Sequence, residues 1–192
     1  MTVVLDARVR DVLARLEAAP ARPPAVSVPP ATGRFLFALV APHNACKVLE
    51  LGGGRGYSTI WLAAGARHLG GRVLSIEREP DIAREWRENI SAAGLADTAE
   101  LIESDALEAV PSMDDVFNVV FLDAADRYYE ELFRLVRPKL DPGALVVADN
   151  VLSRPELLAA YCEARQSDPT LESATVPAGE GLELSVVLTN SV

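Results

Sequence analysis

The sequence predicts an α/β domain in which parallel strands alternate with helices. The chain has 192 residues, of which 49% are apolar, so it can bury a sizeable core in one domain. From Lys47 onward, short apolar runs alternate with stretches of helical periodicity. A glycine-rich turn, Gly52 to Gly56, follows the first of these runs. This alternation is typical of parallel strands joined by right-handed crossover helices.

The apolar runs mark the expected strands. The first five are Val48–Leu51, Val73–Ile76, Ala99–Ile102, Phe117–Leu122 and Ala144–Ala148. Two later runs, Leu171–Val176 and Leu182–Leu188, have proline and glycine between them. Because those residues mark turns, we expect the last two runs to pair as a closing antiparallel hairpin.

Helices are expected between the strands. The helix that begins at Pro80 is the best marked, because Ile82, Trp86 and Ile90 form one apolar stripe and Gly94 can end it. Further helices are expected at Gly33–Val40, after Ser58 as an N-terminal cap, at Arg127–Val136 and at Pro155–Arg165.

The first 30 residues are expected to form a separate segment. Residues 5–18 have apolar side chains at helical spacing and predict an amphipathic helix outside the main domain. The prolines between Pro20 and Pro30 break helix and sheet alike, so this stretch predicts a stiff connector or lid. The expected division is therefore residues 1–30, helix and lid, and residues 31–192, the main α/β domain.

Charge and cysteine content exclude several classes of function. A net charge of −10 argues against a nucleic-acid partner, which requires clustered lysine and arginine. Cys46 and Cys162 show no repeating spacing, which indicates a reducing compartment. No stretch approaches the roughly 20 apolar residues of a membrane span, and the apolar run at the N-terminus is too short for a signal peptide. We expect a cytoplasmic protein with no membrane partner.

The glycine-rich turn is a candidate ligand site. Gly52, Gly54 and Gly56 follow a strand and precede a helix, so a ligand can approach bare backbone there. A dinucleotide fingerprint requires Gly-x-Gly-x-x-Gly, but its third glycine would fall on Tyr57. A tight turn with no ligand is the alternative interpretation of the same glycines.

Acidic residues at the strand ends narrow the choice of ligand. Glu50 lies in the first strand, Glu77 ends the second, and Asp105 follows the third. Glu77 lies 21 residues beyond Gly56, close to the roughly 20 at which an acid binds ribose hydroxyls. Carboxylates repel pyrophosphate and attract cations. S-adenosylmethionine fits such a site, because it carries a sulfonium, an ammonium group and a ribose diol.

A second set of polar residues predicts a site for a hard metal ion. Asp123 ends the strand Phe117–Leu122, and Asp149 and Asn150 end the next strand. Parallel neighbouring strands bring these ends together at the edge where ligands bind. Oxygen ligands of this kind select Mg²⁺ or Ca²⁺ over Zn²⁺. The alternative is that Asp149 and Asn150 form a turn and Asp123 only borders the cofactor.

Taken together, these stretches resemble the class I, catechol O-methyltransferase-like methyltransferases, including the small bacterial O-methyltransferases. The resemblance covers about Val28 to Leu188. The matching stretches are VLELGGGRGYSTIWLA, GRVLSIEREP, IESDALEAVP, FNVVFLDAADRYY, LDPGALVVADNV and VPAGEGL. The resemblance implies a Rossmann-like, seven-stranded, mostly parallel sheet with a reversed C-terminal hairpin and helices on both faces.

The resemblance also implies roles for individual residues. The residues implied at the cofactor are Val28 at the lid, Glu50, Gly52, Gly54, Gly56, Tyr57 and Ser58 at the methionine part, Glu77 at the ribose, Asp105 and Ala106 near the adenine, and Asp123. Asp123, Asp149 and Asn150 match the metal ligands. In such enzymes the metal binds two neighbouring substrate oxygens, and the methyl group moves by direct displacement.

One position departs from the family. A lysine commonly lies three residues after the first metal aspartate and takes the hydroxyl proton, whereas this chain has Asp126 there. Asp126 can serve as the base, bind the metal, or cap the helix that begins near Arg127; capping is the simplest interpretation.

Three functions follow as hypotheses. The first is an O-methyltransferase for a small acceptor with vicinal hydroxyls, assisted by a divalent cation, with Asp123 and Asp126 as catalytic residues. The second is a metal-independent methyltransferase or a cofactor-binding protein without catalysis, and the third is a nicotinamide-dependent dehydrogenase, which Tyr57 disfavours. A homodimer is expected, because family members often dimerise and the N-terminal helix has an apolar face.

Overall fold

The computed structural model describes residues 5–21, 23 and 27–189. The first four residues lie outside this range, as do positions 22 and 24–26 of the predicted lid, including Pro24.

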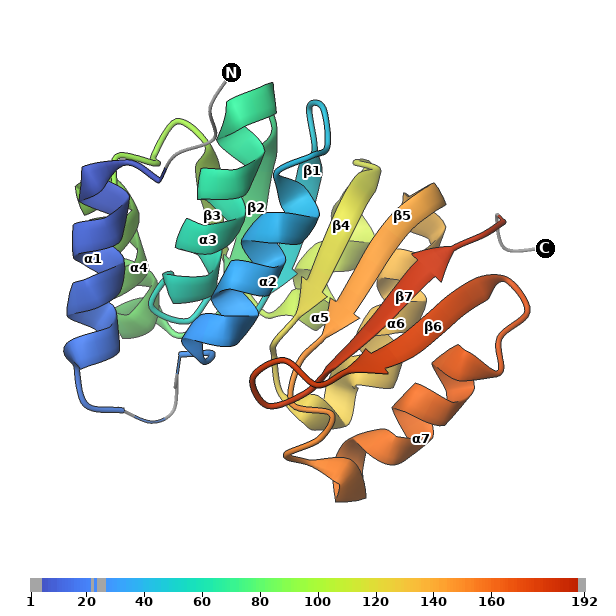
Figure 1. The fold of residues 1–192 in the computed structure, drawn as a ribbon. Helices are drawn as coiled ribbons and strands as arrows, with labels where there is room; N and C mark the ends of the chain where they lie inside the picture. The colour runs from blue at the N-terminus through green and yellow to red at the C-terminus, as the bar shows by residue number, and fades with distance from the viewer. Residues whose placement is uncertain (1–4, 22, 24–26, 190–192) are drawn as a thin grey trace.

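The structure confirms the predicted fold class. One sheet of seven strands has the order β3-β2-β1-β4-β5-β7-β6, and β7 is antiparallel to β5 and to β6 (Figure 1). The strands are β1 (Lys47–Leu51), β2 (Arg72–Glu77), β3 (Ala99–Glu103), β4 (Phe117–Leu122), β5 (Leu140–Ala148), β6 (Leu171–Val176) and β7 (Leu182–Val187). All the predicted strands are present, although β5 begins four residues earlier, where its pairing with β4 is irregular.

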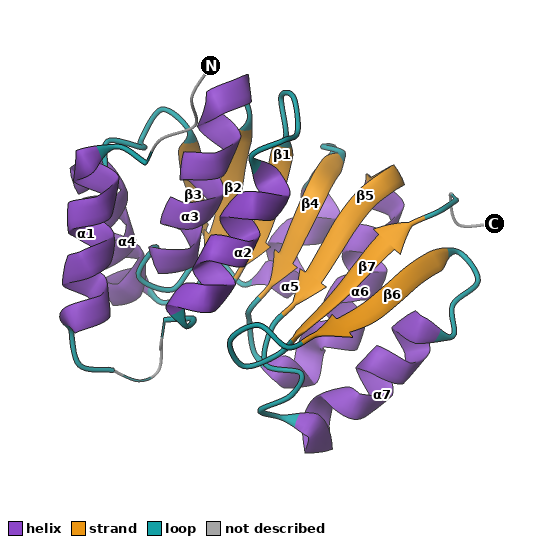
Figure 2. Ribbon diagram, viewed as in Figure 1, coloured by secondary structure: helices purple, strands orange, loops and turns teal. Residues whose placement is uncertain are grey.

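Helices cover both faces of the sheet (Figure 2). They are α1 (Ala7–Ala18), α2 (Pro30–Val40), α3 (Tyr57–Ala66), α4 (Pro80–Ala92), α5 (Ala106–Ala109), α6 (Tyr129–Val136) and α7 (Pro155–Gln166). Short 3₁₀ turns follow or precede some of them, at Arg67–Leu69, Val110–Ser112, Asp126–Tyr128 and Arg137–Lys139. The short helix α5 was not predicted.

Alternation along the strands divides the core into two layers. In β1, Val48 packs in the layer that includes α1 to α4, whereas Leu49 and Leu51 pack in the layer that includes α5 to α7. Glu50 has the parity of Val48, which places its side chain on the α3 side of the sheet. Glu50 is a predicted site residue, and the alternation along β1 decides which layer of side chains surrounds it.

The position expected for the N-terminal helix is wrong. Val9, Val12 and Leu13 of α1 are buried in the core layer that also contains α3 and α4. Arg15 adds a hydrogen bond from its Nη2 to Asn89 Oδ1 of α4, at 2.8 Å. The apolar face of α1 is therefore covered within the chain and gives no argument for a partner subunit. The division of the chain at residue 30 stays a prediction.

The start of α3 also differs from the prediction. The residue before the helix is Gly56, whose φ of 87° lies in the left-handed region that favours glycine. Ser58 is buried in the first turn and does not cap the helix through its side chain. The glycine therefore sets where the helix begins.

Within the described residues, no helix is long and apolar enough to cross a membrane.

Candidate active site

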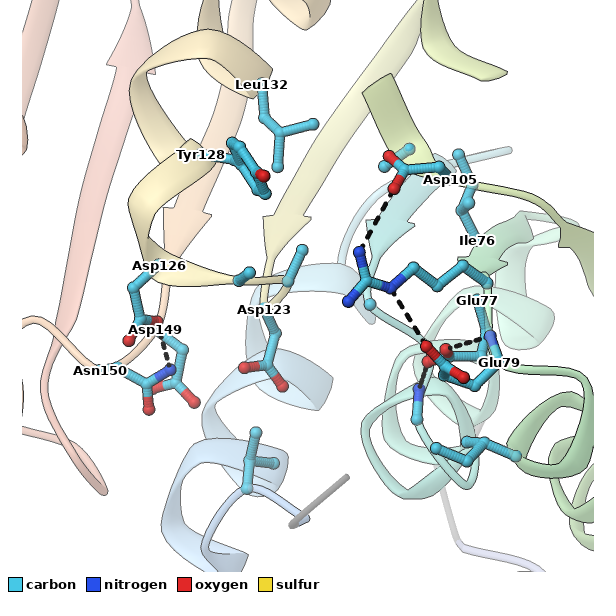
Figure 3. Close-up of a pocket in the computed structure, with 18 of the residues that line it drawn as sticks. Ile76, Glu77, Glu79, Asp105, Asp123, Asp126, Tyr128, Leu132, Asp149 and Asn150 are labelled. Atoms are coloured by element: carbon cyan, nitrogen blue, oxygen red, sulfur yellow. Dashed lines mark hydrogen bonds and ion pairs between the residues drawn. The ribbon is translucent and has the colours of Figure 1, made fainter. Parts of the chain in front are cut away.

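A cavity of about 540 Å³ opens at the carboxyl ends of the parallel strands (Figure 3). The strand order reverses between β1 and β4, and open α/β sheets bind ligands at such a point. Two groups of residues face each other across it. We call them the glycine end, which comprises Gly52, Gly54, Glu77, Asp105 and Ala106, and the aspartate end, which comprises Asp123, Asp126, Asp149 and Asn150.

The glycine end depends on a close approach between two strand ends. Gly52 has a φ of +99°, and a Cβ atom there would lie 2.2 Å from the carbonyl oxygen of Asp123. A Cβ at Gly53 would lie 2.3 Å from the hydroxyl oxygen of Ser75. Both positions require glycine for lack of space, and Gly52 also for its backbone conformation.

Glu77 is held by the backbone on two sides. Its Oε2 accepts a hydrogen bond from the amide of Gly54, and its Oε1 accepts one from the amide of Glu79, both at 2.9 Å (Figure 3). The carboxylate thereby fixes the glycine turn against the end of β2. Its position is set without a ligand.

Asp105 is held in a similar way. Its Oδ1 accepts from the amide of Leu107 at 2.9 Å and so caps α5. Arg78 forms ion pairs with Asp105 and Glu79, with a nitrogen–oxygen distance of 3.4 Å to each carboxylate; Figure 3 labels the two acids and draws both pairs as dashed lines. The carboxylates of the glycine end therefore have partners within the chain.

Glu50 lies behind the glycine end and does not line the cavity. Its side chain is fully buried, and its Oε2 accepts hydrogen bonds from the hydroxyls of Thr59 and, at 2.6 Å, Ser75. Its Oε1 has no hydrogen-bond partner among the described residues. Burial raises the pKa of Glu50 to about 7, despite the hydroxyl donors.

The aspartate end holds carboxylates with raised pKa values. Burial, then the charge of Asp149, raises the pKa of Asp123 well above its ordinary value. Asp149 is 1% exposed, and burial raises its pKa to about 6, against a hydrogen bond from the Asn150 backbone. The Oδ1 atom of Asp149 has no hydrogen-bond partner in the described part of the chain. These groups favour the presence of positive charge.

Asn150 and Asp126 are joined across this end. The Nδ2 of Asn150 donates to Oδ1 of Asp126 at 3.2 Å (Figure 3), and Asn150 has a φ of 67°. The capping role expected for Asp126 is wrong, because neither the turn Asp126–Tyr128 nor α6 has a side-chain cap. With its nitrogen engaged, the amide of Asn150 leaves its oxygen for another partner.

The structure brings most, but not all, of the predicted site residues together. Val28, Gly52, Gly54, Glu77, Asp105, Ala106, Asp123, Asp126, Asp149 and Asn150 line the cavity. Glu50, Gly56, Tyr57 and Ser58 do not. The hydroxyl of Tyr57 donates to Oε1 of Glu17 in α1 at 2.6 Å, and Tyr57 lines a separate cavity of about 210 Å³.

Several further lining residues were not among the predicted site residues. Glu180, in the turn between β6 and β7, lines the aspartate end and adds its charge to the causes that raise the pKa of Asp149. Tyr128 and Arg154 also line the cavity. Among the described residues, seven carboxylates and two guanidinium groups line the cavity, so these residues favour cationic ligands. The seven are Glu77, Glu79, Asp105, Asp123, Asp126, Asp149 and Glu180.

No group of three or more histidine, cysteine, aspartate and glutamate side chains is arranged for a metal ion within the described residues. The predicted metal set has two carboxylates and one amide.

Comparisons with known proteins agree with this architecture. Residues 49–151 match the family model described as "Methyltransferase domain". A catechol O-methyltransferase of Niastella koreensis is 34% identical over 79% of this chain and 68% of its own length. A catechol O-methyltransferase of Mycobacterium tuberculosis is 38% identical over 71% of this chain, and the matched region covers 62% of that relative's length.

A solved structure shows the same fold over nearly the whole chain. The crystal structure of the O-methyltransferase from Bacillus cereus in complex with SAH has a TM-score of 0.79 and 28% identity, and the match covers 95% of this chain and 91% of that one. Together with the family model and the relatives, this structural match identifies the family of the protein. The chain belongs to the S-adenosylmethionine-dependent methyltransferases, in the catechol O-methyltransferase-like family of small O-methyltransferases.

Proposed function

We propose that the protein transfers the methyl group of S-adenosylmethionine to one hydroxyl of a small phenolic acceptor with vicinal hydroxyls, with a divalent cation bound at the aspartate end. The observation that carries this proposal is Asp149, a buried carboxylate with an unpartnered oxygen that lines the cavity beside Asn150. The relatives named as catechol O-methyltransferases support the acceptor class.

The glycine end is proposed to bind the cofactor. Glu77 takes the ribose hydroxyls, Asp105 and Ala106 lie at the adenine, and the turn at Gly52 faces the methionine part. Val28 closes the site from the lid side. Gly54, Gly56, Tyr57, Ser58 and Glu50 contribute by shaping this turn. For the last four this contribution is indirect, because they do not line the cavity.

The aspartate end fits a hard cation. Asp123, Asp149 and Asn150 would supply oxygen ligands, and the buried Oδ1 of Asp149, which has no hydrogen-bond partner among the described residues, favours a cation beside it. When bound, Mg²⁺ or Ca²⁺ acts as a Lewis acid that lowers the pKa of an acceptor hydroxyl. The raised pKa values of the two aspartates fit this, because burial, and then the charges of neighbouring carboxylates, disfavour their ionised forms, which a cation would stabilise.

The chemical step is a displacement at carbon. The acceptor oxygen forms a bond to the methyl carbon as the bond from that carbon to the sulfonium sulfur breaks. The products are S-adenosylhomocysteine, a methyl ether and a proton. We propose that Asp126 takes this proton through Oδ2, because its Oδ1 accepts from Asn150. Asp123, the member of the aspartate end whose carbonyl oxygen lies against the turn at Gly52, is proposed to border the cofactor as well as the acceptor.

Calorimetry tests the two halves of this proposal separately. Wild-type protein should bind S-adenosylhomocysteine at sub-millimolar concentration; the absence of binding would refute the cofactor assignment. Asp149→Ala should bind S-adenosylhomocysteine almost as wild type does and lose catechol methylation. If it keeps methylation, the assignment of the cation site is wrong.

A metal-independent methyltransferase, or a cofactor-binding protein without catalysis, is a second candidate. It is favoured by Asp126, which replaces the lysine that the family commonly has at this position. A metal-independent enzyme predicts that Asp149→Ala methylates an acceptor as fast as wild type. A binding protein predicts that wild type and variant both bind S-adenosylhomocysteine and that neither methylates any member of a panel of phenols.

A homodimer in the cytoplasm is proposed on the family resemblance and the cysteine content, with no support from the face of α1. Light scattering after size exclusion tests the dimer: a mass near 20.6 kDa, that of one chain, would contradict it.

A further inference from the structure

Arg154 is a charged residue of the cavity that the proposed function does not use. It lies in the loop between β5 and α7, it is exposed, and it lines the same cavity as Asp149 and Asn150. The guanidinium of Arg78, which also lines the cavity, pairs with two carboxylates. The guanidinium of Arg154 forms no ion pair and no hydrogen bond with the described residues. Its charge is therefore available to a ligand.

The backbone of Arg154 is tied to the aspartate end. Its amide donates to the carbonyl oxygen of Asn150 at 2.8 Å, which closes the loop that follows β5. Its own carbonyl oxygen accepts from the amides of Leu157 and Leu158, both at 3.0 Å, in the first turn of α7. The side chain of Arg154 therefore begins from a backbone that is held on one side by a proposed cation ligand and on the other by a helix.

Neighbouring acids have other partners than this guanidinium. Oδ1 of Asp126 accepts from the amide of Asn150 at 3.2 Å, and Oε2 of Glu180 accepts from the hydroxyl of Ser153 at 2.8 Å. Water can satisfy an exposed guanidinium, so stability does not require a partner for it. A cation that lines a ligand cavity nevertheless attracts the anionic groups of whatever binds there.

The place of Arg154 in the sheet favours the acceptor over the cofactor as its ligand. Its loop follows β5, whereas the glycine turn follows β1, and β4 lies between these two strands. The methionine part of S-adenosylmethionine, which carries the carboxylate of the cofactor, is proposed at the glycine turn. An acceptor bound at the aspartate end would instead lie beside the loop that carries Arg154.

We propose that Arg154 is a specificity-determining residue that binds an anionic substituent of the acceptor, so that catechols with a ring carboxylate are preferred over neutral ones. A guanidinium can bind a carboxylate through two parallel hydrogen bonds. The acids that line the cavity would repel such a substituent, and the charge of Arg154 offsets this repulsion. The inference rests on the proposed function, because the hydroxyls of the acceptor must bind at the aspartate end.

The experiment compares two acceptors of nearly the same shape, protocatechuate and its neutral amide. Each is titrated by calorimetry into protein that holds S-adenosylhomocysteine and Mg²⁺. We expect wild type to bind the acid about fivefold more tightly than the amide, or better. Arg154→Gln should lose this preference through weaker binding of the acid alone. Arg154→Lys, which keeps the charge but not the two parallel hydrogen bonds, should keep part of it.

Arg72→Gln is the matched control for the change in total charge. Arg72 is also exposed, and its guanidinium has no ion pair or hydrogen bond within the described part of the chain. It begins β2, whose other end, Glu77, lines the cavity. Arg72→Gln should therefore leave both affinities unchanged. In methyl transfer, the ratio of kcat/KM for the acid to kcat/KM for the amide should fall in Arg154→Gln and not in Arg72→Gln.

The outcomes separate this inference from the proposed function. If wild type shows no preference for the acid, or if Arg154→Gln keeps the preference, the role of Arg154 is wrong and the proposed function stands. If Arg154→Gln instead weakens the binding of S-adenosylhomocysteine, Arg154 binds the carboxylate of the cofactor and the acceptor role is wrong. If wild type binds neither acceptor, the proposed acceptor class is wrong and this inference fails with it.

Discussion

The two ends of the cavity differ in how completely their carboxylates find hydrogen-bond and ion-pair partners within the chain. At the glycine end, Glu77 accepts two backbone hydrogen bonds, and Asp105 caps a helix and pairs with Arg78. At the aspartate end, Asp149 has an unpartnered buried oxygen and a raised pKa, and Asn150 has a left-handed backbone. The carboxylates of the glycine end therefore have partners within the chain, whereas the described residues leave a buried carboxylate oxygen of the aspartate end without one. We therefore expect the glycine end to be sensitive to shape and the aspartate end to be sensitive to charge.

The largest effect is expected from Gly52→Ala. The new Cβ would lie 2.2 Å from the Asp123 carbonyl oxygen, so the turn between the two ends must move. Gly70→Ala is the matched control, since its φ of +74° carries similar strain but no atom lies within 4 Å of its Cβ. The control should lose roughly 1–2 kcal/mol of unfolding free energy, and Gly52→Ala considerably more, together with S-adenosylhomocysteine binding. If urea unfolding showed the same loss of unfolding free energy for Gly52→Ala and Gly70→Ala, the close approach of Gly52 to the Asp123 carbonyl would be contradicted.

The next effect concerns pH and Glu50, which lies behind the glycine end. Its pKa is raised from 4.5 to about 7 in the folded protein, so the unfolded chain releases the proton at lower pH. The free energy of unfolding therefore falls as pH rises from about 4.5 to about 7. Glu50→Gln keeps the acceptor for Thr59 and Ser75 and removes this loss. Without ligand, the free energy of unfolding of Glu50→Gln should exceed that of wild type by a small amount at pH 5 and by up to roughly 3 kcal/mol at pH 8. A difference that does not change with pH would contradict the raised pKa.

A smaller effect is expected at Asp105. Asp105→Ala removes the cap of α5 and should cost about 0.5–2 kcal/mol of unfolding free energy, with weaker S-adenosylhomocysteine binding. Asp105→Asn keeps a capping oxygen and loses only the charge that pairs with the exposed Arg78, which is worth little. The asparagine variant should therefore stay close to wild type in both measurements. If asparagine were as harmful as alanine, charge rather than capping would order this end.

Most of the fold follows from local patterns in the sequence. The strands are short apolar runs bounded by glycine, proline or acids, and the helix at Pro80 carries its own start and stop signals. Where the prediction failed, distant contacts decided the structure. The helix α1 carries an ordinary amphipathic pattern, and nothing in it shows that α3 and α4 will cover its face. Ser58 is a good cap by residue type, but the left-handed Gly56 takes that place.

The candidate site divides in the same way. The strand-end acids could be placed because parallel strands end at one edge, and Glu77, Asp105, Asp123 and Asp149 do line one cavity. Glu180 could not be placed, since it reaches the cavity only because the β6–β7 hairpin folds back beside β5.

We propose that methyl transfer requires a cation at the aspartate end. The most direct measurement is the rate of methyl transfer from S-adenosylmethionine to a catechol in three conditions: with Mg²⁺, after chelation, and after Mg²⁺ is restored. We expect transfer in the first, none in the second, and recovery in the third, with S-adenosylhomocysteine affinity nearly unchanged throughout. Transfer that continues at the same rate after chelation would contradict this proposal.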